Sequence, residues 1–243
     1  MKQFGLIGYP LSHSFSKNYF SKKFQNEHIL DSEYEVYPLK EIEDFLELCI
    51  QQNKLVGLNV TIPYKEKVIA YLDELSEEAK QINAVNTIKF IEGKKIGYNT
   101  DCYGFERSLQ PLLQSHHKNA LILGTGGASK AVEFVLKKLG IGFQYVSRKA
   151  SEKSIAYAAL NEEIMQSATL IFNCTPIGMY PAVEAAPEIP YQFITEKHLL
   201  YDLVYNPEVT LFLKNGKENG AQIKNGLEML HLQAEKSWEI WNS

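Results

Sequence analysis

The chain has 243 residues, of which 45% are hydrophobic and 22% are charged, and its formal net charge is -4. This length suits two modest domains or one large one, with enough apolar residues for a substantial core. Because the balance is slightly acidic and no run of like charges occurs, the composition argues against a nucleic-acid partner or an anionic membrane surface. No apolar stretch approaches the roughly 18 residues of a membrane span, and we expect a cytoplasmic protein.

The cysteines also bear on the compartment and on metal binding. Cys49, Cys102 and Cys174 are odd in number and far apart, so the sequence offers neither a disulfide framework nor the C-x-x-C spacing of a metal site. We therefore expect three reduced cysteines and no bound metal.

Residues 1–101 alternate between strand patterns and helix patterns. Apolar or alternating runs predict strands over 4–7, 33–37, 55–60 and 84–91. The turn at 92–95 leads from the last of these to an antiparallel partner that ends near Tyr98. Helical spacing predicts a helix from Tyr19 onward, a second over 41–52 with Leu46 facing inward, and helical turns between 65 and 82. The pattern is typical of an α/β domain of mostly parallel strands with an edge hairpin.

The stretch 119–149 predicts a strand, a glycine turn, a helix and a second strand. Residues 120–123 are a short apolar run that stops at Gly124, and Gly126 and Gly127 follow. The turn matches the dinucleotide fingerprint G-x-G-x-x-G only in part, since Ser129 stands where the third glycine belongs. A helix over 131–139 would point its N–H groups at a pyrophosphate. The alternative is a purely structural bend.

The second strand of this stretch, residues 143–146, is followed by Ser147, Arg148 and Lys149. A protein that binds NAD would place an Asp or Glu there to bond the ribose 2′-hydroxyl. Two cations at this position favour a 2′-phosphate, and therefore NADP. The alternative is a solvated pair of charges at a strand end.

The rest of the chain continues the α/β pattern. Residues 101–114 and 156–168 predict helices, and 169–172 and 199–204 predict strands. The loop 173–178 follows the carboxyl end of a strand, where open α/β sheets bind ligands. From Gly226 onward a helix carries an apolar face that includes Leu227, Trp238 and Trp241. Because so apolar a face must be covered, we expect this helix to fold back on the first domain.

Uncharged polar side chains gather in the turns of the first domain, and such short donors and acceptors suit a polyhydroxylated ligand. They are Ser12, Ser14, Asn59, Thr61, Asn86, Thr87, Asn99 and Thr100, followed by the acid Asp101. Each also has a structural alternative, since Ser14 and Asp101 would cap the helices that follow them. By itself, Lys65 would be a surface lysine.

Nine motifs, in order along nearly the whole chain, resemble those of the shikimate dehydrogenases. The first four are GYPLSHSFS (8–16), NVTIPYK (59–65), NAVNT (83–87) and GYNTD (97–101). The other five are GTGGAS (124–129), SRK (147–149), NCTPIGM (173–179), DLVYNP (202–207) and NGLEMLHLQA (225–234). The resemblance implies an α/β protein of two domains. Residues 1–101 plus 226–243 would form a mostly parallel substrate-binding domain, and residues 102–225 a Rossmann-like NADP-binding domain.

The resemblance also implies an activity, the NADP-dependent interconversion of 3-dehydroshikimate and shikimate by hydride transfer, on the route to chorismate and the aromatic amino acids. The partner would be this small-molecule substrate, with no nucleic acid and no membrane, and the chain would be a monomer or a homodimer. Two alternatives remain open. One is a dehydrogenase that also accepts quinate or uses NAD, and the other is a catalytically silent sensor that binds a shikimate-like ligand.

Carried over residue by residue, the resemblance implies the site residues. Lys65 and Asp101 would serve the proton transfer, while Ser12 and Ser14 would hold the substrate carboxylate. Ring hydroxyls would be bound by Asn59, Thr61, Asn86, Asp101, Tyr205 and Gln233. The cofactor would be bound by Gly124, Thr125, Gly126, Gly127, Ala128, Ser147, Arg148, Lys149, Thr175, Leu203 and Gly226. Lys17, Asn83, Thr125 and Ser147 depart from the usual residues of the family, and none of these changes removes a proposed catalytic group.

Overall fold

The structure, a computed structural model, describes residues 1–11, 15–52 and 54–243. It divides into two compact units, Met1–Thr100 with Ala234–Ser243, and Asp101–Gln233. Within the described part of the chain, no helix has the length and apolar character needed to cross a membrane.

The second division between the units lies inside the last helix, α8 (Leu227–Asn242), and not before it at Gly226 as we expected from the sequence. The start of α8 packs closely on α4 (Asp101–Leu109), the first helix of the second unit. A Cβ atom at Gly104 of α4 would come within 2.5 Å of the Met229 carbonyl oxygen. Glycine therefore permits a backbone approach that keeps the first turns of α8 with the second unit.

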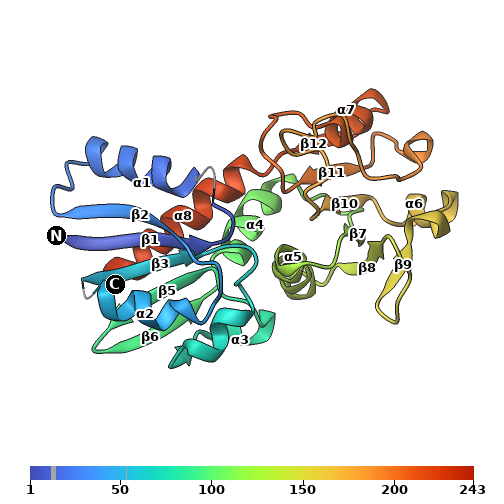
Figure 1. The fold of residues 1–243 in the computed structure, drawn as a ribbon. Helices are drawn as coiled ribbons and strands as arrows, with labels where there is room; N and C mark the ends of the chain where they lie inside the picture. Colours follow the sequence, from blue (N-terminus) through green and yellow to red (C-terminus); the bar gives the residue numbers. More distant parts are fainter. Residues whose placement is uncertain (12–14, 53) are drawn as a thin grey trace. The chain divides into compact units, whose positions relative to one another are not determined.

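The first unit is a six-stranded sheet with helices on both faces (Figure 1). Its strands are β1 (Lys2–Gly8), β2 (Ser32–Pro38), β3 (Leu55–Val60), β4 (Glu74–Leu75), β5 (Thr87–Ile91) and β6 (Lys94–Tyr98). Its helices are α1 (Phe15–Asn26), α2 (Asp44–Gln51), the 3₁₀ turn η1 (Lys67–Tyr71), α3 (Glu77–Ile82) and the last turns of α8.

The strands of this sheet lie in the order β2-β1-β3-β5-β6-β4. β1 pairs in parallel with β2 and β3, whereas β5 pairs antiparallel with β3 and β6. The expected hairpin is therefore present. It is not at the edge, because the two-residue strand β4, which the sequence did not predict, pairs with the far side of β6.

A bulge in β3 decides which side chains reach each face of the sheet. Gln3 pairs with Leu55 but Phe4 pairs with Gly57, so one extra residue stands in the ladder between them. Such a residue reverses the alternation of the strand. Beyond the bulge, Leu58 belongs to the core under α2, whereas Asn59 bonds to α8.

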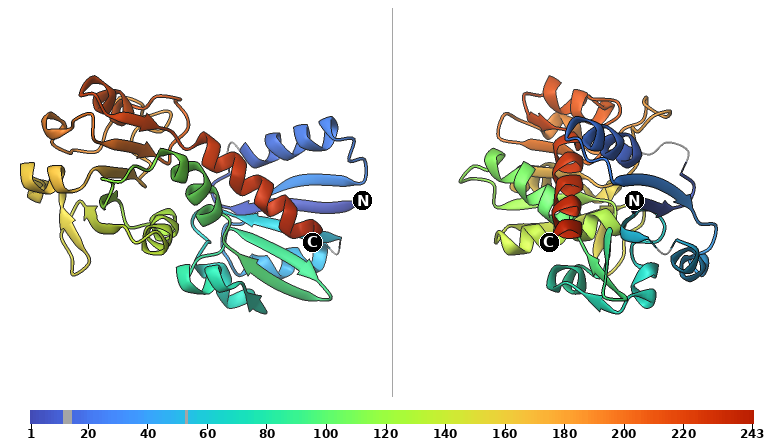
Figure 2. Two further views of the ribbon diagram at one scale, coloured as in Figure 1. Left: turned by 180° about the vertical axis from the view of Figure 1, so that it is seen from behind. Right: turned by 90° about the vertical axis from the view of Figure 1, so that its left-hand side faces the viewer.

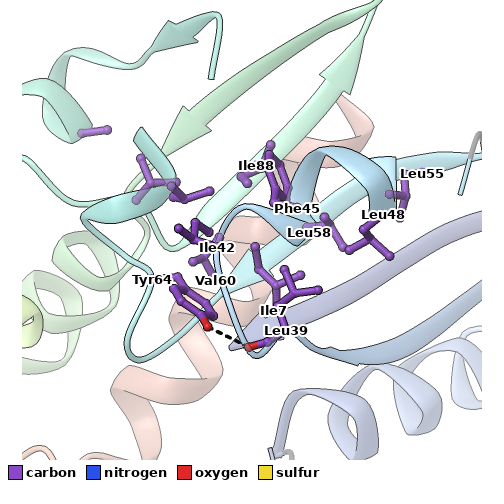
Figure 3. Packing of buried hydrophobic residues seen from close by; sticks show 13 residues of the cluster. Ile7, Leu39, Ile42, Phe45, Leu48, Leu55, Leu58, Val60, Tyr64 and Ile88 are labelled. Carbon is purple, nitrogen blue, oxygen red and sulfur yellow. Dashed lines mark hydrogen bonds between the residues drawn. The ribbon is translucent and has the colours of Figure 1, made fainter. Parts of the chain in front are cut away.

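The helix α2 covers one face of the sheet, the face to which Leu58 and Ile88 contribute. Figure 3 shows Phe45 and Leu48 of α2 among the side chains of Leu58 and Ile88 from the strands. The expectation that Leu46 faces inward was wrong, since this residue is 46% exposed. The buried stripe of the helix runs through positions 45 and 48, and position 46 lies about 100° around the axis from 45.

The other face carries an aromatic cluster that the end of α8 completes. Phe4 of β1 and Phe20 of α1 are fully buried there, and the Trp241 ring lies 5.0 Å from the ring of Phe4. The Trp241 indole nitrogen donates to the Ile88 carbonyl oxygen at 2.9 Å. Figure 2 shows the last turns of α8 crossing this face beside α1. The prediction that the final helix folds back on the first domain is confirmed for residues 234–242.

Trp241 fits against the sheet only because residue 57 has no side chain. A Cβ atom at Gly57 would lie 2.1 Å from the indole nitrogen of Trp241. We expect Gly57→Ala to push the indole out and to lower the free energy of unfolding by about 1–3 kcal/mol, the usual cost of overpacking. Chemical denaturation would measure this loss. Gly126→Ala is the control, since a Cβ atom there meets no atom within 4 Å. Equal stability of the two variants would contradict the prediction.

The second unit is a doubly wound sheet of six parallel strands. Its strands are β7 (Asn119–Leu123), β8 (Gly142–Ser147), β9 (Ser154–Ala156), β10 (Leu170–Asn173), β11 (Leu199–Asp202) and β12 (Gln222–Lys224). Its helices are α4, η2 (Gln110–Leu112), α5 (Gly127–Lys138), η3 (Tyr157–Ala159), α6 (Glu162–Ser167), η4 (Tyr191–Phe193), α7 (Leu211–Glu218) and the start of α8.

The strand order is β12-β11-β10-β7-β8-β9, which in chain order reads 6-5-4-1-2-3. The direction of winding reverses between β7 and β10, where Leu123 and Asn173 are partners at the carboxyl ends of the two strands. Sheets of this kind bind ligands in the crevice outside the strand ends at such a reversal. The glycine turn after β7 and the loop after β10 both begin there.

The segment between β8 and α6 differs from the prediction of one helix over 156–168. Ser154–Ala156 is the strand β9, which pairs in parallel with β8, and the α-helix covers only Glu162–Ser167. The ladder with β8 takes Ala156 into the strand, and the 3₁₀ turn η3 (Tyr157–Ala159) follows before α6 begins. The helix α7 and the strand β12 were also not predicted.

Candidate functional site

The glycine turn joins β7 to α5 and has the backbone that close approach to a ligand requires. Gly124 has a φ of +99°, a conformation in which a side chain would be strained. Gly126 precedes α5, and a Cβ atom there would meet no atom within 4 Å. Ser129, which replaces the third glycine, is fully buried and donates its hydroxyl to the Gly126 carbonyl oxygen at 2.6 Å. The turn is therefore closed by a hydroxyl, while the surface at Gly126 stays open.

The short connection after β8 is held by serine hydroxyls. The Ser147 hydroxyl donates to the Lys149 carbonyl oxygen and lies 2.9 Å from the hydroxyl of Ser154. Arg148 and Lys149 are exposed, and neither forms an ion pair with any residue in the described ranges. Two cations therefore stand at the end of the strand next to the glycine turn, available to an anionic ligand.

Three further residues assigned to the cofactor, Thr175, Leu203 and Gly226, take part in close contacts at a glycine backbone. The Thr175 methyl group would be 2.8 Å from a Cβ atom at Gly124, so the loop after β10 touches the glycine turn. The Leu203 carbonyl oxygen would be 2.2 Å from a Cβ atom at Gly226. Only glycine permits these contacts. The structure thus brings the predicted cofactor residues of the second unit to one edge of its sheet.

In the first unit, the amides of Asn59 and Asn86 are buried in a network of hydrogen bonds. Asn59 accepts from the Tyr34 hydroxyl at 2.8 Å, and its Nδ2 lies 3.1 Å from the Ser237 hydroxyl. Asn86 is 2% exposed and accepts from the Thr100 backbone N–H at 2.7 Å. Both amides have several protein partners, so they fix the ends of β3 and β5 to Thr100 and to the last turns of α8.

Lys65 follows the turn at the end of β3. The Tyr64 backbone N–H donates to the Thr61 carbonyl oxygen at 2.9 Å, which closes the turn. The carbonyl oxygen of Lys65 accepts from the Val85 N–H at 2.7 Å, and the next residue, Asn86, is bonded to Thr100. Two hydrogen bonds therefore link the backbone of Lys65 to the residue before Asp101. The Lys65 side chain is half-buried.

Asp101 is the first residue of α4 and is 6% exposed. Gly104 follows one turn later on the same side of the helix, and a Cβ atom there would be 3.2 Å from Cβ of Gln233. The packing of α8 on α4 therefore brings Gln233 to the side of the helix on which Asp101 lies. Tyr205 is half-buried, and this burial raises the pKa of its hydroxyl. Ser12 and Ser14 lie outside the described residues.

Sequence reasoning missed Ser237, which is fully buried on the inner face of α8. Its hydroxyl lies 2.8 Å from the hydroxyl of Thr87 and contacts the Asn59 amide. The only signal in the sequence was a small polar residue on the apolar face of the helix, between Ala234 and Trp241. Ser237 connects α8 to the polar network at the ends of β3 and β5.

Comparison with known proteins matches these features to one family. The family model described as the shikimate dehydrogenase substrate binding domain matches residues 6–88. Shikimate dehydrogenase (NADP(+)) of Desulforamulus reducens is 36% identical, with 98% of this chain and 88% of that protein covered. The chain belongs to the shikimate dehydrogenase family.

Solved structures of shikimate dehydrogenases have the same fold. The Thermus thermophilus enzyme in complex with NADP(H) and shikimate has a TM-score of 0.87 and 31% identity, over 99% of this chain and 93% of that one. The Listeria monocytogenes enzyme in complex with shikimate and NAD has a TM-score of 0.87 and 28% identity, over 100% of this chain and 92% of that one. The shikimate dehydrogenase fold thus extends over the whole of this chain.

The open surface at Gly126 yields a test that separates ligand binding from folding. We expect Gly126→Ala to change the free energy of unfolding by less than about 1 kcal/mol, since the position is a helix N-cap with free space. The added methyl group would stand where backbone N–H groups meet a pyrophosphate, so the dissociation constant for NADP should rise by about tenfold or more. Fluorescence titration with NADPH measures this. Unchanged affinity would mean that the turn does not contact the pyrophosphate.

Proposed function

We propose that this protein is an NADP-dependent dehydrogenase that interconverts 3-dehydroshikimate and shikimate by hydride transfer, in the biosynthesis of chorismate and the aromatic amino acids. The proposal rests mainly on the residues that follow the carboxyl ends of the strands in the second sheet. There, the positive-φ Gly124 and the exposed cation Arg148 follow the neighbouring strands β7 and β8. The assignment of 3-dehydroshikimate and shikimate as substrates rests on membership of the shikimate dehydrogenase family.

The residues at this edge fit NADP. The open surface at Gly126 and the N–H groups at the start of α5 would take the pyrophosphate. Arg148 and Lys149 would take the 2′-phosphate, and the Leu203 and Gly226 backbones would lie beside the nicotinamide. When bound, NADP accepts or supplies the hydride.

A second set of residues would bind the substrate and move the proton. Reduction of a ketone leaves an alkoxide-like oxygen, and we assign the Lys65 ammonium to stabilise that charge and deliver the proton. The Asp101 carboxylate would orient the Lys65 amine and the reacting hydroxyl. Ser12 and Ser14 would hold the substrate carboxylate, and ring hydroxyls would bond to Asn59, Thr61, Asn86, Tyr205 and Gln233. Asn59 would use the second lone pair of its Oδ1, because its Nδ2 already faces protein acceptors.

An absorbance assay at the NADPH band tests the proposal, with shikimate or quinate as substrate and NADP or NAD as cofactor. We expect shikimate with NADP to give the highest kcat/KM of the four combinations. Faster turnover with NAD or with quinate would favour the broader dehydrogenase. Binding of shikimate without turnover in any combination would favour the silent sensor.

The compartment and the assembly are part of the same proposal. No two of the three cysteines are joined in a disulfide, which fits a reducing compartment, so we place the protein in the cytoplasm. We propose a monomer or a homodimer that takes a small-molecule substrate. Light scattering after size-exclusion chromatography distinguishes the two states, and a larger assembly would contradict both.

A further inference from the structure

A buried carboxylate at the end of β11 has no part in the roles assigned so far. Asp202 is fully buried. Its Oδ1 accepts from the Asn173 side-chain amide at 2.9 Å and from the Val204 backbone N–H at 3.0 Å, and its Oδ2 accepts from the Thr210 hydroxyl at 2.6 Å. All three partners are donors. The ionised carboxylate is therefore the form that satisfies the whole set.

The first of these bonds leads to the glycine turn. Asn173 is the partner of Asp202 on the neighbouring strand β10. Its Oδ1 accepts from the backbone N–H of Thr175 at 3.1 Å and from the Thr175 hydroxyl at 2.6 Å. The methyl group of Thr175 in turn packs against Gly124. The Asp202 carboxylate therefore sets, through the side chains of Asn173 and Thr175, the position of the loop that borders the glycine turn.

The other two bonds fix the segment that follows β11. The bond from Val204 bends the chain directly after the strand, and the Leu203 N–H donates to the Asn173 carbonyl oxygen at 3.0 Å. Leu203 then meets Gly226. The Thr210 hydroxyl, besides donating to Asp202, caps α7 by accepting from Leu213. Residues 203–210, which include Tyr205, are thus held at both ends by the same carboxylate.

This arrangement is costly for folding. Burial raises the pKa of Asp202 to about 6, and no lysine or arginine of the described residues forms an ion pair with it. The titratable groups near it are the Cys174 thiol and the Tyr191 hydroxyl, and burial raises the pKa of both, so both are neutral at pH 7. A carboxylate that is buried without a cation opposes folding when ionised. The three donors that meet there, from Asn173, Val204 and Thr210, offset part of this cost.

We propose that Asp202 is a positioning residue for the cofactor. Through Asn173 it holds the Thr175 loop, and through Val204 and Thr210 it holds the Leu203 segment, in the arrangement that binds pyrophosphate and nicotinamide. The inference rests on the proposed function, because it takes NADP to bind at this edge of the sheet.

The substitution Asp202→Asn tests the proposal. The amide keeps the size of the side chain but turns one acceptor into a donor, so one of the three partners loses its bond. We expect the dissociation constant for NADPH to rise by roughly tenfold to a hundredfold, and KM for shikimate at saturating cofactor to change less, through Tyr205 alone. Unchanged NADPH affinity in the folded variant would overturn the positioning role. Failure of the unmodified protein to bind NADPH would instead overturn the proposed function.

A matched pair of threonine variants separates positioning from general disturbance of the sheet. Thr210→Val removes the hydroxyl that donates to Asp202, and Thr210→Ser keeps it. Thr169→Val removes a buried hydroxyl that has no partner among the described residues, directly before β10. We expect weaker NADPH binding for Thr210→Val, recovery for Thr210→Ser and no change for Thr169→Val. Equal losses for the two valine variants would overturn the proposal.

The pH dependence of binding gives a readout that lost stability alone would not produce. As the pH falls through about 6, Asp202 gains a proton and can no longer accept all three bonds. The 2′-phosphate also titrates near pH 6, but it does so equally with both proteins. We expect the ratio of NADPH affinities, unmodified protein over Asp202→Asn, to fall toward one between pH 7.5 and pH 5. A constant ratio would overturn the role of the charge.

Discussion

We expect replacement of Lys65 with methionine to lower the turnover number for shikimate oxidation by about 10²- to 10⁴-fold, with a much smaller change in KM. Methionine keeps the unbranched stem of lysine and loses the ammonium, so packing would be preserved while the charge that we assign to the alkoxide-like oxygen would be removed. Lys65 is half-buried after the turn that closes β3, and its backbone is bonded to Val85. Steady-state kinetics at saturating NADP measure the effect.

Two further variants define what the Lys65 result means. Lys67→Met alters an exposed lysine at the start of η1, and we expect it to leave the turnover number unchanged. Asp101→Asn should reduce both turnover and substrate binding, because that carboxylate would touch the substrate hydroxyl directly. If Lys65→Met kept near-normal turnover and lost only affinity, Lys65 would be a substrate anchor. The proton would then come from Asp101 or from water.

The second large effect concerns the choice of cofactor. We expect Arg148→Ala to weaken NADP binding by roughly 2 to 3 kcal/mol, the value of charge-assisted hydrogen bonds to a phosphate. This corresponds to a rise of roughly 30- to 150-fold in KM for NADP. KM for NAD should barely change, because NAD has no 2′-phosphate. The exposure of Arg148 and its lack of ion pairs with other described residues mean that its removal disturbs no bond of the protein.

A control on the same connection separates a specific contact from general attraction. Lys153 is also exposed and lies before β9. We expect Lys153→Ala to change KM for NADP little, since the ionic atmosphere screens a charge that does not touch the phosphate. Equal losses with NADP and NAD after Arg148→Ala would refute the 2′-phosphate contact and leave Arg148 as a solvated charge.

Much of the fold could be predicted because many helices, strands and turns have a recognisable residue pattern within their own segment. The apolar run at 55–60 became β3 with the same limits, and the glycines after β7 became a turn with positive φ at Gly124. The apolar face of the last helix required a partner surface, and Trp241 packs in the aromatic cluster of the first unit. In these cases, local pattern and tertiary packing agree.

The elements that the sequence did not predict are those that form because of residues elsewhere in the chain. β9 has three residues, too few to show an alternation, and it exists because Tyr145 and its neighbours in β8 offer a parallel partner. The bulge in β3 is likewise invisible in sequence, because it is a mismatch between two strands. Both elements depend on pairing between strands, which the amino-acid pattern of a single segment does not encode.

Some residues of the candidate site could likewise be predicted from the sequence, and others could not. The glycine turn and the cations after β8 can be read from residue types, since phosphates require close backbone and positive charge. The polar residues of the first unit stood out by their place in the turns, but their individual roles came from resemblance alone, because one asparagine or serine has too many structural uses. Asp202 belongs to the DLVYNP motif, but nothing in the sequence indicated its role. Its partners Asn173 and Thr210 are 29 and 8 residues away, and only the fold shows that three donors meet on one carboxylate.

The discontinuous first unit has a consequence for the order in which the nascent chain folds. Phe4, Phe20 and Tyr34 leave the ribosome early, whereas Ala234 and Trp241, which complete their cluster, are synthesised roughly 200 residues later. At translation rates of about 5–20 residues per second, the delay is roughly 10 to 40 seconds. During that time the whole of Asp101–Gln233 emerges. The unit that comes second in the gene can therefore fold first, while the earlier one waits with an aromatic surface open to chaperones.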